Sequence, residues 1–234
     1  MKRGAGSDPN LELLSTMVDL LGDIADELVF VGGCATGLFI TSMRAQTVRV
    51  TWDVDVVAEA ATLREYHAIE ARLRKKGFRH DPEIVCRWTV QALQLDLLPS
   101  APGVLGFHNR WYPKALATAQ SRRLPSGRVI RLVTSPLFLA TKLEAFLDRG
   151  QGDYLVSHDL EDIITVVDGR ESLLNEVEAV DADVRTYIRE RITALLRDED
   201  FLTAVPGYLP GDVVSQARLP NVMDVLKRLA GERS

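Results

Sequence analysis

The sequence contains few of the features that mark membrane, secreted or metal-cluster proteins. No apolar run approaches the roughly 20 residues that a membrane-spanning helix needs. Residues 11–21 are interrupted by Glu12 and Asp19, so the N-terminal stretch is not of signal-peptide type. Two cysteines, Cys34 and Cys86, make no metal or redox spacing. We therefore expect a cytoplasmic protein with reduced cysteines and no membrane partner.

The chain also lacks the excess positive charge that indiscriminate nucleic-acid binding requires. Its formal net charge is −5, whereas such binding depends on many Lys and Arg contacts to phosphates. Two local basic clusters remain. We expect the first to be solvated surface; it consists of Arg72, Arg74, Lys75, Lys76 and Arg79. For the second, surface exposure and contact with a polyanionic substrate both stay open; it consists of Arg122, Arg123, Arg128 and Arg131.

Two acids, Asp53 and Asp55, stand two residues apart in an alternating segment, residues 47–57. Alternate side chains of a strand share a face. The pattern therefore predicts that Thr51 and the two acids point away from a core face formed by Val48, Val50, Trp52, Val54 and Val56. Adjacent carboxylates repel each other, and a magnesium ion offsets the repulsion with a hard cation that prefers oxygen ligands. The pair is a candidate Mg²⁺ site.

A glycine pair, Gly32 and Gly33, directly follows the apolar strand predicted over residues 28–31. Glycine lets backbone N–H groups approach phosphate oxygens, and the start of the following helix favours anions. A dinucleotide-binding turn is the competing interpretation. It requires the spacing G-x-G-x-x-G, which Cys34 breaks, and it gives no role to the two acids.

A third acid, Asp96, lies in another alternating segment, residues 87–98. We interpret this segment as one strand whose core face carries Leu93, Leu95 and Leu97 and whose other face carries Asp96. A lone acid before Pro99 could also be an ordinary strand-end residue. The order of glycine turn, paired acids and third acid favours a shared site.

The periodicity changes from mixed to helical near residue 134. Helices are predicted over residues 10–27, 35–41 and 62–76, and a hairpin over residues 116–133 turns at residues 126–127. After this point, helices are predicted over 134–148 and from a cap at Ser157 to about residue 168, followed by further helical spacing. We expect an α+β protein: a catalytic domain of residues 1–133, with a mixed sheet flanked by helices, and a helical domain of residues 134–234 with a C-terminal bundle.

Nucleotidyl transfer is the chemistry that these acids suit. A nucleophile attacks the α-phosphorus of a nucleoside triphosphate (NTP), and Mg²⁺ ions about 3.5 to 4 Å apart hold the attacking and leaving groups. Asp53 and Asp55 would bridge these ions. Asp96 would complete the metal site or act as the base, and the Gly32-Gly33 turn would hold triphosphate oxygens.

The motifs together resemble the nucleotidyltransferase superfamily, and most closely AbiEii-type abortive-infection toxins. Gly32, Gly33, Asp53 and Asp55 match the first motif of that family and Asp96 the second, while a lysine and an aspartate on two successive helices match Lys142 and Asp159. The match spans about residues 28–168. It departs from relatives that carry Ser or Thr directly before the first acid, because Trp52 stands there after Thr51.

The resemblance implies an Mg²⁺-dependent enzyme that transfers a nucleoside monophosphate from an NTP to an acceptor hydroxyl. In the toxin group the acceptor can be a tRNA 3′ end, and the partner is a cognate antitoxin protein. Lys142 would be a cation for the triphosphate and Asp159 would orient it; Asp162 is the rival for this role. The alternatives are a transferase that inactivates a small-molecule antibiotic, and an inactive nucleotide-binding regulatory module.

The pairs His80-Asp81 and His158-Asp159 also suggest a metal phosphohydrolase of the His-Asp type. Only four histidines exist, and His80-Asp81-Pro82 is typical of a turn, so we set this interpretation aside.

Overall fold

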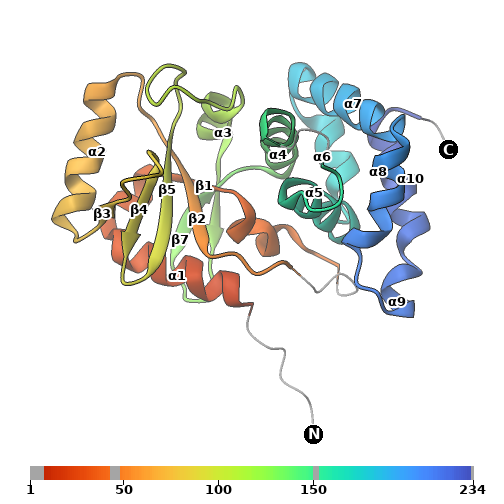
Figure 1. Ribbon diagram of the computed structural model, residues 1–234, viewed down its shortest axis with the longest axis horizontal. Coiled ribbons are helices and arrows are strands. Elements are labelled where there is room, and N and C mark those ends of the chain that lie inside the picture. Colours follow the sequence, from red (N-terminus) through yellow and green to blue (C-terminus); the bar gives the residue numbers. More distant parts are fainter. Residues whose placement is uncertain (1–7, 43–47, 150–152, 233–234) are drawn as a thin grey trace, which may run out of the picture. The chain divides into compact units, whose positions relative to one another are not determined.

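The chain folds into two compact units. The computed structural model describes residues 8–42, 48–149 and 153–232. The first unit comprises residues Met1–Gly37 and Val50–Thr134, and the second comprises Leu38–Arg49 and Ser135–Ser234. A mixed sheet with helices lies in the first unit and helices make up the second (Figure 1), so the predicted α+β class is confirmed. The functional division at residue 133 stays a prediction.

The first unit is built on one sheet. In the described residues its strand order is β3-β4-β5-β2-β1-β7-β6. The strands are β1 (Val29–Val31), β2 (Asp53–Ala58), β3 (Arg79–His80), β4 (Arg87–Val90), β5 (Leu93–Pro99), β6 (Gln120–Arg123) and β7 (Val129–Leu132). Strand β2 pairs in parallel with β5 and antiparallel with β1. The end of β1 therefore lies beside the start of β2, where Val31 pairs with Asp55.

Helix α1 (Pro9–Leu21) packs against β2 and β5 (Figure 1). It begins because Asp8 caps it: Oδ1 accepts a hydrogen bond from Asn10 N at 2.9 Å, and Pro9 occupies the first turn. The remainder of the helix predicted over residues 10–27 is a 3₁₀ helix, η1 (Gly22–Glu27). The break follows from Gly22, whose φ is +57°.

Thr62 starts helix α2 (Leu63–Lys75) with a capping box, in which the Thr62 hydroxyl accepts from Glu65 N and the Glu65 carboxylate accepts from Thr62 N. Gly77, with φ +88°, follows the helix as predicted. A further helix, α3 (Tyr112–Thr118), packs against β2 and includes residues 116–118, the first part of the hairpin predicted over residues 116–133. The remainder forms the hairpin of β6 and β7.

The strand predicted over residues 47–57 is shorter, because β2 begins at Asp53. Val50 and Trp52, predicted to face the core, are 48% and 79% exposed, whereas Thr51 is buried. The side chain of Asn10 explains the difference: its Oδ1 accepts a hydrogen bond from Thr51 N at 3.0 Å and takes this backbone group out of any strand pairing. Residues 43–47 lie outside the described part of the chain.

The single strand predicted over residues 87–98 is a hairpin formed by β4 and β5. Gln91 and Ala92 connect the strands with φ values of +48° and +67°. Positive φ at both central residues is the geometry of a type I′ turn, for which Asn-Gly is the usual sequence signal. The Gln-Ala pair carries no such signal, so the sequence pattern concealed the turn.

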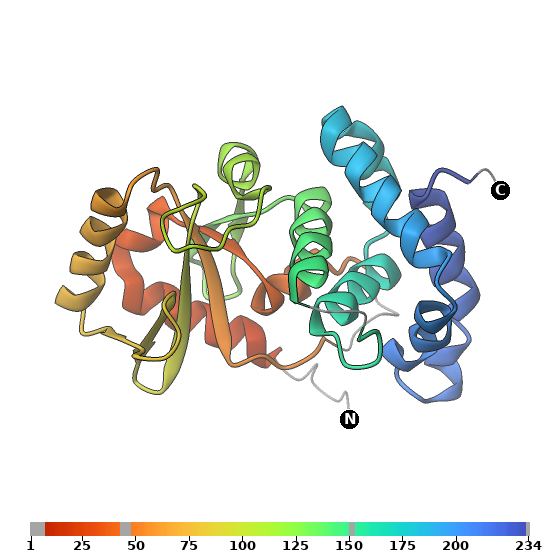
Figure 2. The same ribbon diagram turned by 45° about the horizontal axis from the view of Figure 1, so that its top comes forward.

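The second unit is helical in its described part. Its elements are η2 (Gly33–Phe39, shared with the first unit), α4 (Ser135–Arg149), α5 (His158–Gly169), α6 (Leu173–Ala179), α7 (Ala182–Leu196), α8 (Glu199–Ala204), η3 (Val205–Tyr208), α9 (Val213–Gln216) and α10 (Leu219–Leu229). Helix α4 packs against α5 and α7, and α10 packs against α7 and α5 (Figure 2). Ser157 caps α5 by accepting from Leu160 N, as predicted.

Among the described residues, no helix combines the length and the apolar composition that crossing a bilayer requires. Cys34 and Cys86 are buried and free. Burial, together with the charges of Asp96 and Asp55, raises the pKa of the Cys86 thiol to about 12, so this thiol stays protonated and unreactive at neutral pH.

Candidate active site

Asp53 and Asp55 occupy the first and third positions of β2. Val54, between them, is buried in the core, and so are Val56 and Val57. Both acids are partly exposed, which fits the alternation of faces along a strand. The two carboxylates therefore lie on the same side of the sheet.

Asp96 is delivered to the same region by the neighbouring strand. The parallel register of β2 and β5 pairs Asp55 with Asp96 and Asp53 with Gln94. Directly paired residues project from the same face of a sheet. Asp96 is buried, with 8% of its surface exposed. Strand pairing thus places the third predicted acid beside the first two.

The backbone at Gly32 closes against Asp55. Gly32 has φ +72°, and a β-carbon added to it would lie 1.8 Å from Asp55 Oδ2 and 2.5 Å from Asp55 Cγ. No larger residue fits this space, and the positive φ separately favours glycine. Gly33 is buried and begins η2, which is a 3₁₀ helix in place of the helix predicted over residues 35–41. Gly32 is therefore the glycine that shapes the acid pair.

Arg87, which the sequence did not single out, binds two of the three acids. Its Nε lies 2.8 Å from Asp96 Oδ1, and one terminal nitrogen lies 2.8 Å from Asp96 Oδ2 and 3.1 Å from Asp53 Oδ2. The hydrogen bonds with Asp96 raise the pKa of Arg87, although burial opposes them, so the guanidinium is permanently charged. The signal that could have found it is the hairpin register, which pairs Arg87 with Asp96.

Thr51 completes the polar contacts of Asp53. Its hydroxyl donates to Asp53 Oδ1 at 2.6 Å, while Oδ2 faces Arg87. Each oxygen of the Asp53 carboxylate therefore has a donor. Because the Thr51 backbone is held by Asn10 from α1, the orientation of Asp53 depends on a buried contact outside its own strand.

The carboxylates of Asp53 and Asp55 are compatible with a magnesium ion whose remaining ligands are water or phosphate oxygens. Among the described residues, no group of three or more His, Cys, Asp or Glu side chains is arranged as a metal cage. Mg²⁺ does not require such a cage, because it is usually held by one or two carboxylates together with water and substrate phosphates. Asp53 and Asp55 offer hard oxygen donors on one face, and the approach of Gly32 limits where Asp55 can point. These are the residues that would hold the ion.

Lys142 and Asp159 form a buried ionic cluster in the second unit. Lys142 Nζ lies 3.1 Å from Asp159 Oδ1 and 2.6 Å from Asp162 Oδ2. Arg149 donates to both oxygens of Asp159, at 3.1 and 3.0 Å. Arg49 lies 3.5 Å from Asp162. Lys142 therefore contacts the predicted partner, Asp159, and its rival, Asp162, at the same time.

Asp159 stays ionised within this cluster. Burial favours its neutral form, but the positive charge of Lys142 and the hydrogen bonds from Arg149 and Lys142 more than offset burial and lower its pKa. Only 5% of the Asp159 residue surface and 8% of Lys142 are exposed. The cluster fixes the ammonium group of Lys142 in one position.

The histidine-aspartate pairs do not form a metal site. His80 Nε2 lies 2.9 Å from the Val85 carbonyl oxygen, and Asp81 Oδ1 accepts hydrogen bonds from Glu83 N and Ile84 N. Both side chains therefore hold the turn before β4. His158 is exposed and lies 3.5 Å from Glu161.

Members of the two basic clusters make contacts within the protein. In the first cluster, Arg72 bonds Glu27, Lys76 bonds Asp23 and Arg74 pairs with Glu70 and lies over the Trp88 ring. In the second cluster, Arg123 donates to the Gly127 carbonyl oxygen, Arg131 to the Leu116 carbonyl oxygen, and Arg128 pairs with Asp19. Contact of the second cluster with a polyanionic substrate stays a prediction.

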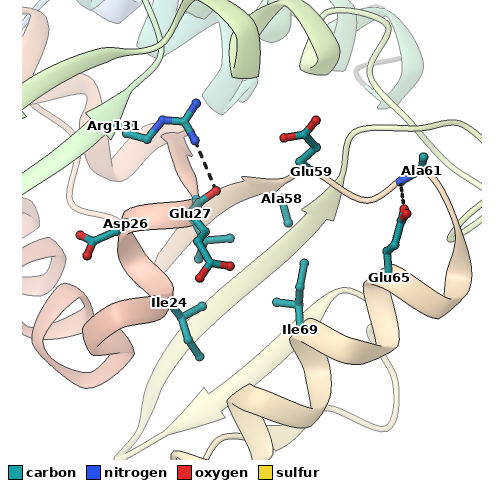
Figure 3. A pocket seen from close by; sticks show the side chains of 10 residues that line it. Ile24, Asp26, Glu27, Ala58, Glu59, Ala61, Glu65, Ile69 and Arg131 are labelled. Carbon is teal, nitrogen blue, oxygen red and sulfur yellow. Dashed lines mark hydrogen bonds between the residues drawn. The ribbon is translucent and has the colours of Figure 1, made fainter.

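A hollow of about 640 Å³ lies at the opposite end of the central strands (Figure 3). Its lining includes Glu27 and Leu28, which precede β1, and Ala58 and Glu59 at the end of β2. The side chains around it include four carboxylates and one guanidinium, those of Asp26, Glu27, Glu59, Glu65 and Arg131. Predominantly negative walls repel a triphosphate. The hollow is therefore unsuited to an NTP. It lies at the end of β2, whereas Asp53 and Asp55 lie at its start.

No family model matches the chain, and no curated protein matches it. Several solved structures are similar to it, among them the following three. The solution structure of antibiotic-resistance factor ANT(2″)-Ia is 16% identical, with TM-score 0.47, over 81% of this chain and 96% of that one. An antigenic nucleotidyltransferase-like protein from Paracoccidioides brasiliensis is 19% identical, with TM-score 0.48, over 86% and 94%. JHP933 from Helicobacter pylori is 10% identical, with TM-score 0.49, over 97% and 94%.

Proposed function

We propose that this chain is a nucleotidyltransferase that moves a nucleoside monophosphate from an NTP to an acceptor hydroxyl. The single observation that carries the proposal is the strand pairing that sets Asp55 beside Asp96, with Asp53 on the same face and Gly32 closed against Asp55. Two carboxylates that could hold a metal ion, placed at a strand start next to a glycine turn, suit phosphoryl transfer.

Each residue of this site has a distinct task in the proposal. Asp53 and Asp55 hold Mg²⁺, which, when bound, neutralises triphosphate charge and activates the acceptor hydroxyl. A carboxylate has about four lone-pair positions, and Arg87 uses two of those on Asp96. The others stay open for a metal ion or for the acceptor proton. The Gly32-Gly33 turn lets the triphosphate approach the backbone.

Lys142 and Asp159 enter the proposal through the sequence motif. Their contact in the second unit supports a lysine that is held in place by an aspartate. We propose that Lys142 contributes a positive charge to NTP binding and that Asp159 positions it. Asp162 shares this positioning role, because it lies nearer to Lys142 Nζ than Asp159 does.

The acceptor in this proposal is the 3′ end of a tRNA, and the biological role is that of a toxin neutralised by a cognate antitoxin. Support comes from the resemblance to AbiEii-type toxins, which the chain matches in the order of its motifs: glycine turn, paired acids, third acid, lysine and aspartate. The competing acceptor is a hydroxyl of an aminoglycoside antibiotic. A third outcome is nucleotide binding without transfer.

One experiment separates these outcomes. The protein is incubated with each α-³²P-labelled NTP and Mg²⁺, with total tRNA in one arm, an aminoglycoside in a second and no acceptor in a third. Label on tRNA supports the toxin role, and label on the aminoglycoside replaces it with antibiotic inactivation. Absence of both label transfer and pyrophosphate release in every arm, with NTP still bound, identifies a binding module.

A further inference from the structure

Arg87 is held in place through its backbone as well as its side chain. Its N–H donates to the Ile84 carbonyl oxygen at 2.9 Å, and its own carbonyl oxygen accepts from Asp81 N at 2.9 Å. Asp81 also accepts from two backbone N–H groups of the same turn. The start of β4 is therefore fixed, and the arginine side chain leaves it from a defined position.

The guanidinium of Arg87 connects three neighbouring strands. It starts from β4, binds both oxygens of Asp96 on β5 and reaches Asp53 at the start of β2. Its side chain is 18% exposed, and those of Asp96 and Asp53 are 11% and 33% exposed. An exposed ion pair contributes little to stability, but the contact of Arg87 with both oxygens of Asp96 is largely buried and bidentate, which makes it strong.

We propose that Arg87 is a resident counter-cation for Asp53 and Asp96 and that it lowers the affinity of the acid cluster, formed by Asp53, Asp55 and Asp96, for divalent metal ions. While no metal ion is bound, it holds Asp53 and Asp96 together against their mutual repulsion. Metal binding at Asp53 competes with the contact between Asp53 Oδ2 and Arg87. This inference rests on the proposed function, because it concerns the same acids.

The charges of the acid cluster predict how removing Arg87 changes the affinity of the cluster for a metal ion. Arg87 contacts the carboxylates of Asp53 and Asp96, so these three groups together carry one negative charge, and without Arg87 two remain. A guanidinium a few ångströms from a divalent ion also repels it directly. Removing the arginine therefore strengthens metal binding. Removing the arginine also lowers the stability of the metal-free protein, because the carboxylates of Asp53 and Asp96 lose their cationic partner.

The test compares wild type with Arg87→Gln, Arg87→Lys and Arg64→Gln. Arg64 is exposed on α2, so Arg64→Gln removes the same charge away from the cluster. Arg87→Lys keeps the charge but loses the two-pronged geometry, and it provides a folded variant if Arg87→Gln does not fold. Each protein is titrated with MnCl₂ alone, with free Mn²⁺ counted by electron paramagnetic resonance. Each is also melted with and without MgCl₂.

Arg87→Gln should bind Mn²⁺ at least about tenfold more tightly than wild type. It should melt at a lower temperature without metal and gain more from MgCl₂ than wild type does. Arg87→Lys should fall between the two, and Arg64→Gln should match wild type. Equal or weaker Mn²⁺ binding by Arg87→Gln, or by Arg87→Lys if only that variant folds, overturns the role of Arg87. If wild type still transfers label from NTP, the proposed function survives that result.

Discussion

Gly32 and Asp55 are packed so closely that a β-carbon on Gly32 would lie 1.8 Å from Asp55 Oδ2. Only a glycine at the end of β1 leaves room for the aspartate on the paired strand. The glycine turn and the acid pair are thus one structural unit, although more than 20 residues separate Gly32 from Asp55 in the sequence.

Gly32→Ala should therefore lower stability by more than the cost of placing alanine at positive φ, and it should also disturb the position of Asp55. An alanine at positive φ costs about 1–2 kcal/mol, and displacement of Asp55 adds to this. Gly127→Ala is the matched control, because Gly127 has φ +88° but no atom within 4 Å of the added β-carbon. Melting curves should show a larger loss for Gly32→Ala, together with a loss of nucleotidyl transfer that Gly127→Ala does not share. Equal behaviour of the two variants would contradict the close packing.

Lys142→Met should destabilise the second unit. It leaves Asp159 and Asp162 buried with only their arginine contacts, at a cost of about 1–3 kcal/mol. Lys227→Met is the control, since Lys227 is an exposed lysine on α10 of the same unit. Urea unfolding followed by circular dichroism measures both. Equal midpoints for the two variants would show that the buried cluster contributes nothing to stability.

The same lysine separates structure from function. If Lys142 contributes to NTP binding, Lys142→Ala should raise the Michaelis constant for NTP more than it lowers the maximal rate, because the metal-binding acids remain. A steady-state transfer assay at a temperature where the variant is folded measures both parameters. An unchanged Michaelis constant would restrict Lys142 to its structural role.

The ion pair of Glu176 should make the free energy of unfolding depend on pH in the acid range. Burial raises the pKa of Glu176, but hydrogen bonds from Arg170, Ser135 and Ser172 outweigh burial and lower the pKa to about 2. A depressed carboxyl pKa contributes stability that is complete above the unfolded value of about 4.5 and is lost as pH falls toward 2. Glu176→Gln and Arg170→Gln should each flatten the stability profile between these pH values. An unchanged profile in chemical unfolding at each pH would contradict the pairing.

Much of the fold could be predicted because its signals are local. Thr62 caps α2 and Ser157 caps α5, and alternation correctly placed Val54 and Val56 in the core and Asp55 on the other face. Periodicity failed where a side chain from elsewhere intervenes. Thr51 is buried and Trp52 exposed because the distant Asn10 holds the Thr51 backbone, a contact that no pattern in residues 47–57 encodes.

The contact between Arg87 and the acids could not be predicted for a related reason. It depends on a hairpin whose turn residues, Gln91 and Ala92, carry none of the usual signals for positive φ. Interpreted as one strand, residues 87–98 place Arg87 far from Asp96. Folded back as β4 and β5, they pair the two residues directly. The acids could be recognised from their sequence motif, whereas Arg87 can be assigned to them only from the pairing register of β4 and β5.

The most direct test of the central claim is transfer of label from α-³²P-NTP by Asp53→Asn compared with wild type. The substitution keeps the size of the side chain but removes the charge that would hold Mg²⁺. Mg²⁺-dependent transfer should fall by at least the roughly 10² to 10⁴ typical of losing a catalytic proton-transfer group. Arg74→Ala, which alters an exposed arginine on α2, should leave transfer unchanged. Full Mg²⁺-dependent transfer by folded Asp53→Asn would contradict the assignment of this strand as the catalytic centre.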